Sequence, residues 1–246
     1  MAQFTEDEKI MRRLEQRFNK GVVKYRLIED GDKILIGLSG GKDSLALLEL
    51  LARRSRILKP KFTVIAVHVG MTNIPYQSDL EYLKGYSEDL GVPFVHYETF
   101  FDPSTDTRKS PCFLCSWNRR KALFTVAKEQ GCNKIALGHH LDDAAETFMM
   151  NLLIESRIGC FAPVTYLSRR DITMIRPLIY VHETAVEQAV ERLNLPVIES
   201  KCPANEKTKR EDAKILLQKL SDEYGDVPER IIGAMQRASI DRWNIK

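Results

Sequence analysis

Runs of consecutive apolar residues alternate along this chain with segments whose apolar residues recur every three or four positions. The first pattern predicts strands buried on both faces, and the second predicts helices with one buried face. The expected strands cover residues 33–38, 63–69, 94–98 and 134–137, and the expected helices cover residues 5–28, 42–58, 77–90, 115–130 and 142–155.

This alternation predicts an α/β fold with a doubly wound parallel sheet and helices on both faces. The pattern weakens after residue 160. Weaker patterns predict short strands at 164–167 and 173–179 and helices at about 182–194, 208–223 and 227–243. The expected organisation is an N-terminal helical extension over residues 1–30, a main domain over 31–200 and a C-terminal segment over 201–246.

Composition narrows the class of protein. A hydrophobic content of 43% with 29% charged residues excludes a disordered chain. No apolar run approaches the length of about 18–20 residues that spans a membrane, and the first residues are too charged for a signal peptide. We therefore expect a cytoplasmic protein that does not enter a membrane. The net charge of +3 decides little by itself.

A glycine-rich hexapeptide follows the first predicted strand and opens a helix. Adjacent glycines let backbone N–H groups approach an anion, and the helix N-terminus adds partial positive charge. The candidate phosphate-binding residues are Ser39, Gly40, Gly41, Lys42, Asp43 and Ser44. The spacing differs from a Walker A motif, because three residues separate Gly37 from Gly41 and Asp43 follows the lysine. A glycine-rich turn without a ligand is the alternative.

Three unusual loops, at 39–44, 68–73 and 138–143, follow predicted strands. Ligands bind at the carboxyl ends of strands in parallel sheets, so the three loops predict one shared site.

The chain has 5 cysteines, an odd number that argues against a disulfide framework. Cys112 and Cys115 form a Cys-x-x-Cys pair, and Cys202 lies in a polar segment, so these three suit an iron–sulfur cluster with one open iron. A redox pair or a structural zinc site remains an alternative. Cys132 and Cys160 have apolar neighbours and are expected to be buried.

The hexapeptide resembles the PP-loop of the N-type ATP pyrophosphatases, which bind ATP and adenylate a carbonyl oxygen. The wider pattern, over about residues 10–240, is similar to the tRNA 2-thiocytidine synthetases and their thiouridine relatives. The shared anchors are 27–32, the loop 39–44, Cys112 to Cys115 with Arg119 and Arg120, the segment 138–143, the segment 175–178, and Cys202 with Arg210.

This resemblance implies a flavodoxin-like fold, tRNA as substrate, and ATP, Mg²⁺ and a four-iron four-sulfur cluster as cofactors. The cluster would be held by Cys112, Cys115 and Cys202. The loop would hold the β- and γ-phosphates, with Asp43 or Asp143 as magnesium ligand. The nucleoside would meet Val67, His68, Val69 and Gly138.

Other residues have a functional and a structural interpretation. Asp143 is the candidate catalytic carboxylate, although Asp142 and Asp143 also suit the N-terminus of a helix. Lys121 is a candidate for neutralising phosphate or assisting proton transfer, with a solvated lysine as the alternative. His139 and His140 could orient ligands or be structural.

Basic residues gather in four clusters, and Trp117 beside Cys115 could stack on a base. The clusters lie at 53–56, 119–121, 169–170 and 201–210. Two of them flank the candidate cluster ligands, where a tRNA loop must come to be modified.

The 2-thiouridine relatives have zinc-ligand cysteines in an N-terminal module. This chain has none ahead of the first strand, so cytidine is the favoured base. Two departures from the 2-thiocytidine pattern are Pro203 and the absence of an additional cysteine before Cys202. The alternatives are a 2-thiouridine synthetase and a cluster-free PP-loop ligase of the lysidine type. The expected sulfur donor is a cysteine desulfurase or free sulfide, and a homodimer is an expected assembly.

Overall fold

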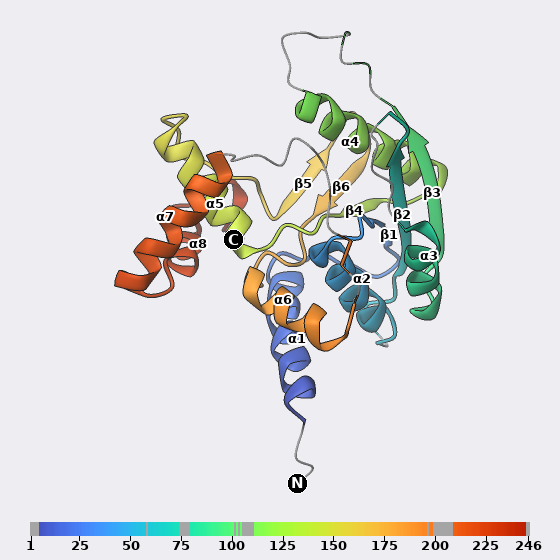
Figure 1. The fold of residues 1–246 in the computed structure, drawn as a ribbon, viewed down its shortest axis with the longest axis horizontal. Helices are drawn as coiled ribbons and strands as arrows, with labels where there is room; N and C mark the ends of the chain where they lie inside the picture. The colour runs from blue at the N-terminus through green and yellow to red at the C-terminus, as the bar shows by residue number, and fades with distance from the viewer. Residues whose placement is uncertain are drawn as a thin grey trace.

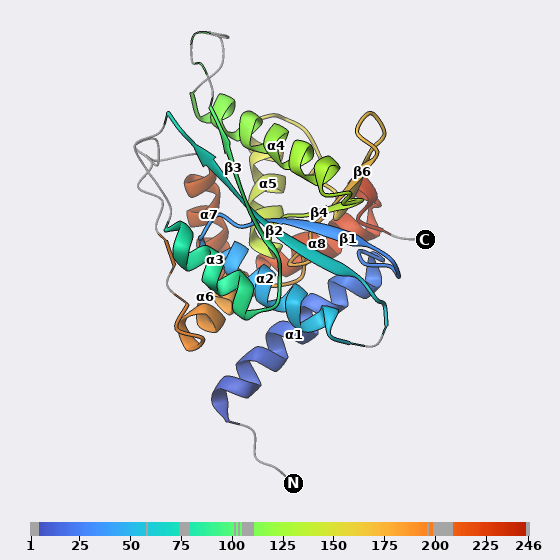
Figure 2. The same cartoon turned by 90° about the vertical axis from the view of Figure 1, so that its right-hand side faces the viewer.

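The computed structural model describes residues 5–57, 59–73, 79–100, 102, 104, 111–195, 197–198 and 209–244, without the side chains of 111 and 112. A six-stranded sheet in the order β3-β2-β1-β4-β6-β5 forms the centre, with helices on both faces (Figures 1 and 2). The strands are β1 (Lys33–Gly37), β2 (Thr63–Met71), β3 (Phe94–Thr99), β4 (Lys134–Ala136), β5 (Val164–Leu167) and β6 (Ile172–Ile175). This arrangement confirms the expected doubly wound α/β fold.

The central strands are buried on both faces, and alternate residues meet different helices. Ile34 and Ile36 of β1 belong to the larger core, which also includes side chains of α2. Leu35 between them packs in a second core with Val126 of α4. Because side chains alternate across a strand, one apolar run supplies both cores.

The helices have these bounds: α1 (Glu6–Lys24), α2 (Lys42–Ser55), α3 (Leu80–Asp89), α4 (Pro111–Glu129), α5 (Leu141–Leu153), α6 (Glu183–Arg192), α7 (Lys209–Tyr224) and α8 (Val227–Arg237). Helix α4 begins four residues earlier than expected, so the backbone of both Cys112 and Cys115 lies within it. The expected helix over 227–243 ends at Arg237, because Ser239, Asp241 and Arg242 have positive φ angles.

The sheet is parallel, as expected, except at one edge, where the sequence pattern indicated no direction for the strands. β5 pairs antiparallel with β6, whereas β6 pairs parallel with β4. A four-residue turn at 168–171 joins β5 to β6, and a connection this short permits only an antiparallel pair. The turn places Arg169 and Arg170 at the amino end of β6, opposite the edge where the loops after β1, β2 and β4 meet.

The C-terminal helices lie beside the sheet rather than on it. α7 and α8 pack against α5 and form a group to one side of the sheet in Figure 1. His182, just before α6, joins this group to the rest, because its Nε2 lies 3.1 Å from Asp226 at the start of α8. Among the described helices, none is long and apolar enough to cross a membrane.

Candidate nucleotide and cluster site

The phosphate loop has the backbone geometry that anion binding requires. Gly40 has a φ of +86°, which disfavours any residue with a side chain. Gly41 is the N-cap of α2 and provides no side-chain cap, so the first N–H groups of the helix stay available to a ligand. The Ser44 hydroxyl donates to the Gly41 carbonyl at 2.8 Å and accepts from the Ser39 hydroxyl at 3.1 Å. The hydroxyl groups of these two serines therefore stabilise the conformation of the loop.

A cavity of about 510 Å³ opens beside the loop at the carboxyl edge of the sheet. It brings together most of the nucleotide-binding residues expected from the sequence, and it adds others that the sequence did not reveal. The expected members are Ser39, Gly41, Lys42, Asp43, Val67, His68, Val69 and Gly138, and the additional ones include Arg119, Leu123, Val197 and Ile198. Three expected residues do not line the cavity: Gly40 and Ser44 are buried within the loop, and Asp143 lies at the start of α5.

Ile198 ties the chain ahead of Cys202 to the phosphate loop. Its N–H donates to the Gly40 carbonyl at 3.0 Å, and its side chain covers the Gly40 Cα so closely that a Cβ there would lie 2.8 Å from Ile198 Cδ1. Glycine at position 40 is therefore needed for its backbone angle and for this contact.

The ammonium of Lys42 is held by acidic side chains of α6. Its Nζ lies 2.8 Å from Glu183 Oε1 and 3.9 Å from Glu187. Burial is the largest single effect and works against the charged lysine, but the hydrogen bond to Glu183 and the charges of Asp43, Glu183 and Glu187 together outweigh it and raise the pKa of Lys42. Lys42 is therefore charged and already paired before any phosphate arrives.

Asp43 is half-buried beside Gly138. A Cβ at position 138 would lie 3.2 Å from Asp43 Cβ, so any other residue there would push Asp43 out of its position. One carboxylate oxygen, Oδ1, is buried without a hydrogen-bond partner, and burial raises the pKa of Asp43. A buried carboxylate oxygen without a partner fits a cation ligand, and Mg²⁺ prefers carboxylate oxygens.

Asp142 and Asp143 have different roles in the structure. Asp142 Oδ2 accepts the N–H of Glu183 at 2.7 Å, so it anchors the start of α6. Burial opposes the charged form, yet the bonds from His182 and Glu183 lower the pKa of Asp142. Asp143 caps α5 by accepting the His140 N–H at 3.0 Å, and its other oxygen lies 2.6 Å from Arg210.

Glu146, one turn after Asp143, was not found by sequence analysis. Its side chain is only 6% exposed, and its carboxylate lies 3.9 Å from Arg210. Burial, reinforced by the charge of Asp143, raises the pKa of Glu146 to about 7. The sequence alone does not indicate that a glutamate within a helix is buried or that its pKa is raised.

His68 and His140 are buried, and His139 is half-buried. His68 Nδ1 lies 2.8 Å from the Leu38 carbonyl, which requires a proton on Nδ1 and leaves Nε2 as an acceptor. His140 accepts the N–H of Asp143, a structural role. His139 Nδ1 is buried without a partner, and burial lowers the pKa of His139 to about 4.

Helix α4 connects the cysteine pair to the cavity. Cys115, Arg119 and Leu123 follow one another at intervals of four, which places them along one side of the helix. The last two line the cavity, and Cys115 packs against Met71 and Leu114. A thiol near a helix N-terminus is favoured as a thiolate, so Cys115 fits a metal ligand.

Among the described residues, the expected catalytic residues Asp143 and Lys121 and the expected cluster ligand Cys115 do not line the cavity. The Cys112 side chain and the whole of Cys202 lie outside the described residues. Lys121 is exposed, about 200° round the helix from Arg119, and its Nζ lies 5.8 Å from the centre of the Trp117 ring. The roles of these residues stay predictions.

The other two cysteines are buried as expected. Cys160 lies 3.3 Å from the Ala144 carbonyl, and burial raises the pKa of Cys160 to about 12. Burial likewise raises the pKa of Cys132. Both behave as small apolar side chains.

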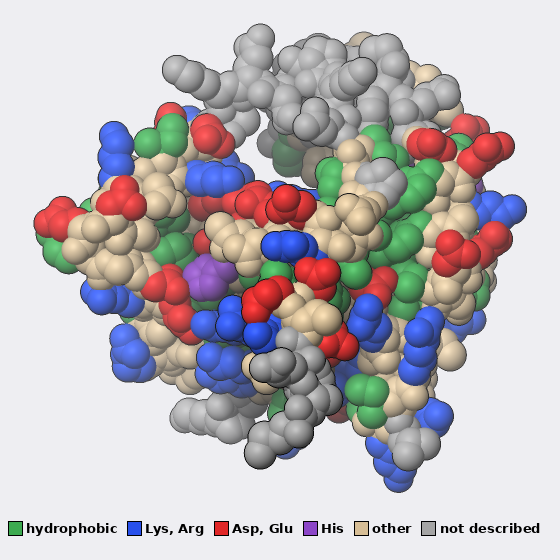
Figure 3. Space-filling view, turned by 60° about the horizontal axis from the view of Figure 1, so that its bottom comes forward, with side chains coloured by type: hydrophobic (Ala, Val, Ile, Leu, Met, Phe, Trp, Pro, Cys, Tyr) green, Lys and Arg blue, Asp and Glu red, His purple; other side chains and the backbone are tan. Residues whose placement is uncertain are grey.

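The basic clusters divide between the two edges of the sheet. Arg53 and Arg54, at the far end of α2 from the loop, bond to Glu49 and Asn19. Arg119 and its neighbours on α4, with Arg210 on α7, lie at the edge that carries the cavity. Figure 3 shows acidic and basic side chains intermixed around a hollow beside the α5–α7–α8 group.

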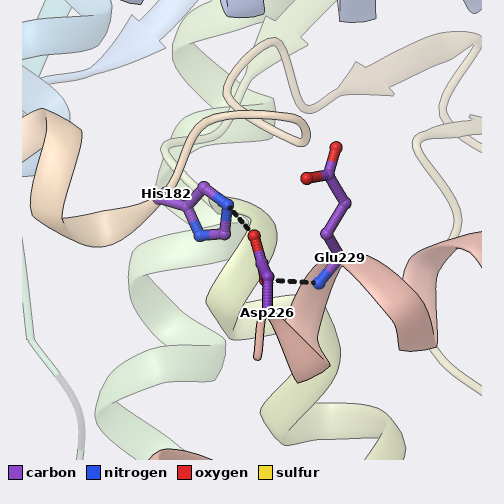
Figure 4. Close-up of side chains that lie close together, drawn as sticks. All are labelled: His182, Asp226 and Glu229. Atoms are coloured by element: carbon purple, nitrogen blue, oxygen red, sulfur yellow. Dashed lines mark hydrogen bonds and ion pairs between the residues drawn. The ribbon is translucent and has the colours of Figure 1, made fainter. Parts of the chain in front are cut away.

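His182, Asp226 and Glu229 lie close enough for a metal site (Figure 4). Each already has protein partners: Asp226 accepts the Glu229 N–H at 2.9 Å, and the Glu229 carboxylate lies 2.8 Å from Arg17. His182 also meets Asp142 at 3.4 Å. The group therefore joins helices, and we assign it no metal.

Comparison with known proteins agrees with this geometry. The PP-loop domain family matches residues 6–217. A tRNA-cytidine(32) 2-sulfurtransferase from Alkalilimnicola ehrlichii is 35% identical, covering 90% of this chain and 70% of the relative. One from Pelobacter propionicus is 33% identical, covering 92% of this chain and 86% of the relative.

A solved structure shows the same fold. The U34-tRNA thiolase NcsA from Methanococcus maripaludis, with its [4Fe-4S] cluster, aligns with a TM-score of 0.79 and 25% identity. The alignment covers 94% of this chain and 79% of that chain.

Proposed function

The chain belongs to the PP-loop family of tRNA 2-sulfurtransferases, and from that premise we propose that it replaces the C2 oxygen of cytidine 32 in tRNA with sulfur, using ATP. The observation that carries the proposal is the cavity in which the phosphate loop, the end of β2 and Gly138 meet, with the cysteine-bearing helix α4 as one wall.

The reaction takes two displacements. The cytosine O2 attacks the α-phosphorus of ATP, the bond to the bridging oxygen of the β-phosphate breaks, and pyrophosphate leaves. Sulfur at the sulfide level (HS⁻) then adds at C2, the bond from C2 to the adenylated oxygen breaks, AMP leaves, and the sulfur loses its proton. The first step moves negative charge onto pyrophosphate, where the α2 N-terminus and Lys42 can stabilise it.

Two carboxylates suit the cation and the chemistry of the first step. Asp43, with its unpartnered buried oxygen, is the proposed Mg²⁺ ligand. Asp143 is the proposed catalytic carboxylate, and it becomes available to substrate or metal when Arg210 moves away.

The iron–sulfur ligands are proposed to be Cys112, Cys115 and Cys202. Three thiolates leave one iron of a four-iron cluster open to a sulfur atom. The chain's own contribution is placement: α4 carries the pair, and Ile198 and Arg210 fix the chain on both sides of Cys202.

The tRNA is proposed to lie across α4. Arg119 and Arg120 are exposed at the cavity edge and can bind phosphates, while the target base leaves its stack to enter the cavity. Trp117, which is 51% exposed, is a surface on which a base can stack. The sulfur donor is proposed to be a cysteine desulfurase or free sulfide, and the assembly a homodimer.

The test is anaerobic purification with iron and acid-labile sulfide measured on the wild type and on Cys112→Ala, Cys115→Ala and Cys202→Ala. We expect about four irons per chain in the wild type, lost in each variant. The matched controls are Cys132→Ala and Cys160→Ala, which should keep their iron. Thiolation of tRNA transcripts with cytidine or uridine at position 32 then tests the base. Zinc in place of iron, or no metal after anaerobic purification, would favour a cluster-free adenylating ligase.

A further inference from the structure

Glu183 holds two lysines at once. Its Oε1 lies 2.8 Å from Lys42 of the phosphate loop, and its Oε2 lies 2.6 Å from Lys214 of α7. The Glu183 side chain is 16% exposed, and it begins α6, whose first N–H is fixed by Asp142. The carboxylate is therefore held in place between the two lysines.

Helix α7 supplies the second lysine in a regular way. Lys214 lies one turn after Arg210, which pairs with Asp143 on α5. The same side of α7 thus neutralises one carboxylate of α5 and one of α6. Glu183 therefore keeps a cationic partner, Lys214, when Lys42 binds another anion.

A bound phosphate and Glu183 compete for the same ammonium. Phosphate on the loop needs Lys42, and a carboxylate within hydrogen-bond distance of that lysine repels the phosphate in a half-buried setting. Glu187, by contrast, lies 3.9 Å from Lys42 and is 52% exposed, so solvent screens it.

We propose that Glu183 is a positioning residue that exchanges Lys42 with bound phosphate: it holds Lys42 together with Lys214 when the loop is empty, keeps only Lys214 when pyrophosphate occupies the loop, and by taking Lys42 back promotes pyrophosphate release. This inference rests on the proposed function, because it needs a phosphate ligand on the loop. The inference assigns to Glu183 a role that the proposed function does not include, namely control of the affinity for pyrophosphate.

The test measures binding of magnesium pyrophosphate by isothermal titration to the whole chain, purified anaerobically with its cluster. Glu183→Gln removes the competitor, so the Kd should fall about fivefold. Lys214→Met removes the alternative partner, which ties Glu183 more firmly to Lys42, so the Kd should rise about threefold. The matched control Glu187→Gln should change the Kd by less than about twofold.

Opposite shifts in the first two variants are a signature that general loss of structure cannot produce. Equal shifts in Glu183→Gln and Glu187→Gln, or shifts of the same sign in Glu183→Gln and Lys214→Met, would overturn the exchange. Inhibition of thiolation by pyrophosphate should follow the same order, with a smaller inhibition constant in Glu183→Gln. If the wild type binds neither pyrophosphate nor ATP, the proposed function itself fails, and the exchange with it.

Discussion

Replacing Glu146 by glutamine should make the protein more stable at alkaline pH and leave its stability unchanged in acid. The carboxyl is buried between Asp143 and Arg210, and its pKa is raised from 4.5 to about 7. A raised carboxyl pKa means that the folded state keeps a proton that the unfolded state loses. The free energy of unfolding of the wild type therefore falls as the pH rises from about 4.5 through about 7 and is level above that.

The magnitude follows from the same numbers. The difference between 4.5 and about 7 corresponds to about 3 kcal/mol at most. We expect about half of that, since Arg210 is 44% exposed and water screens the site. Glu146→Gln should thus be about 1–2 kcal/mol more stable than the wild type at pH 8.

Urea denaturation followed by circular dichroism at pH 5, 6, 7 and 8 measures this difference. Glu155→Gln, an exposed glutamate just after the same helix, is the control and should follow the wild type at every pH. The reasoning is refuted if Glu146→Gln is less stable than the wild type at pH 8, or if the two proteins have the same pH dependence.

Three further changes test other parts of the site. Gly138→Ala places a Cβ 3.2 Å from Asp43 Cβ and should raise the KM for ATP about three- to tenfold; unchanged kinetics would contradict the close contact. Asp143→Asn should lower kcat for thiolation about 100-fold with little change in Tm, whereas Asp142→Asn, which loses an anchor of α6, should lower stability by about 1–2 kcal/mol; the reverse pattern would exchange their roles. Arg119→Met should reduce the slope of log K against log salt for tRNA binding by about one, whereas Arg169→Met, at the opposite edge of the sheet, should not.

Local features of the site were predictable from the sequence. The phosphate loop is one continuous segment whose glycines, lysine and helix start are adjacent in the chain, so its geometry follows from short-range rules. The burial of Cys132 and Cys160 follows from their apolar neighbours. The antiparallel direction of β5 was not predicted, because two weak strand patterns joined by a short turn gave strands at 164–167 and 173–179 without a pairing.

The ion pairs were not predictable, because they join residues far apart in the chain. Lys42 and Glu183 are separated by 141 positions, and Asp143 and Arg210 by 67. The helical spacing of its neighbours places Glu183 on a charged side of the helix, but it does not identify the lysines with which Glu183 pairs. The exposure of Lys121, by contrast, was predictable, because helical periodicity alone places it on the opposite side of α4 from Arg119.

The hydrogen bond from Ile198 to Gly40, together with the pair of Arg210 and Asp143, has a thermodynamic consequence. Ile198 and Arg210 lie on either side of Cys202 in the sequence and contact Gly40 of the phosphate loop and the proposed catalytic Asp143. Under the proposed set of ligands, cluster binding and nucleotide binding therefore share one free energy of coupling. By linkage, whatever factor cluster assembly adds to ATP affinity, ATP adds equally to the affinity for the cluster. Loss of the cluster would then change the affinity for ATP by that same factor.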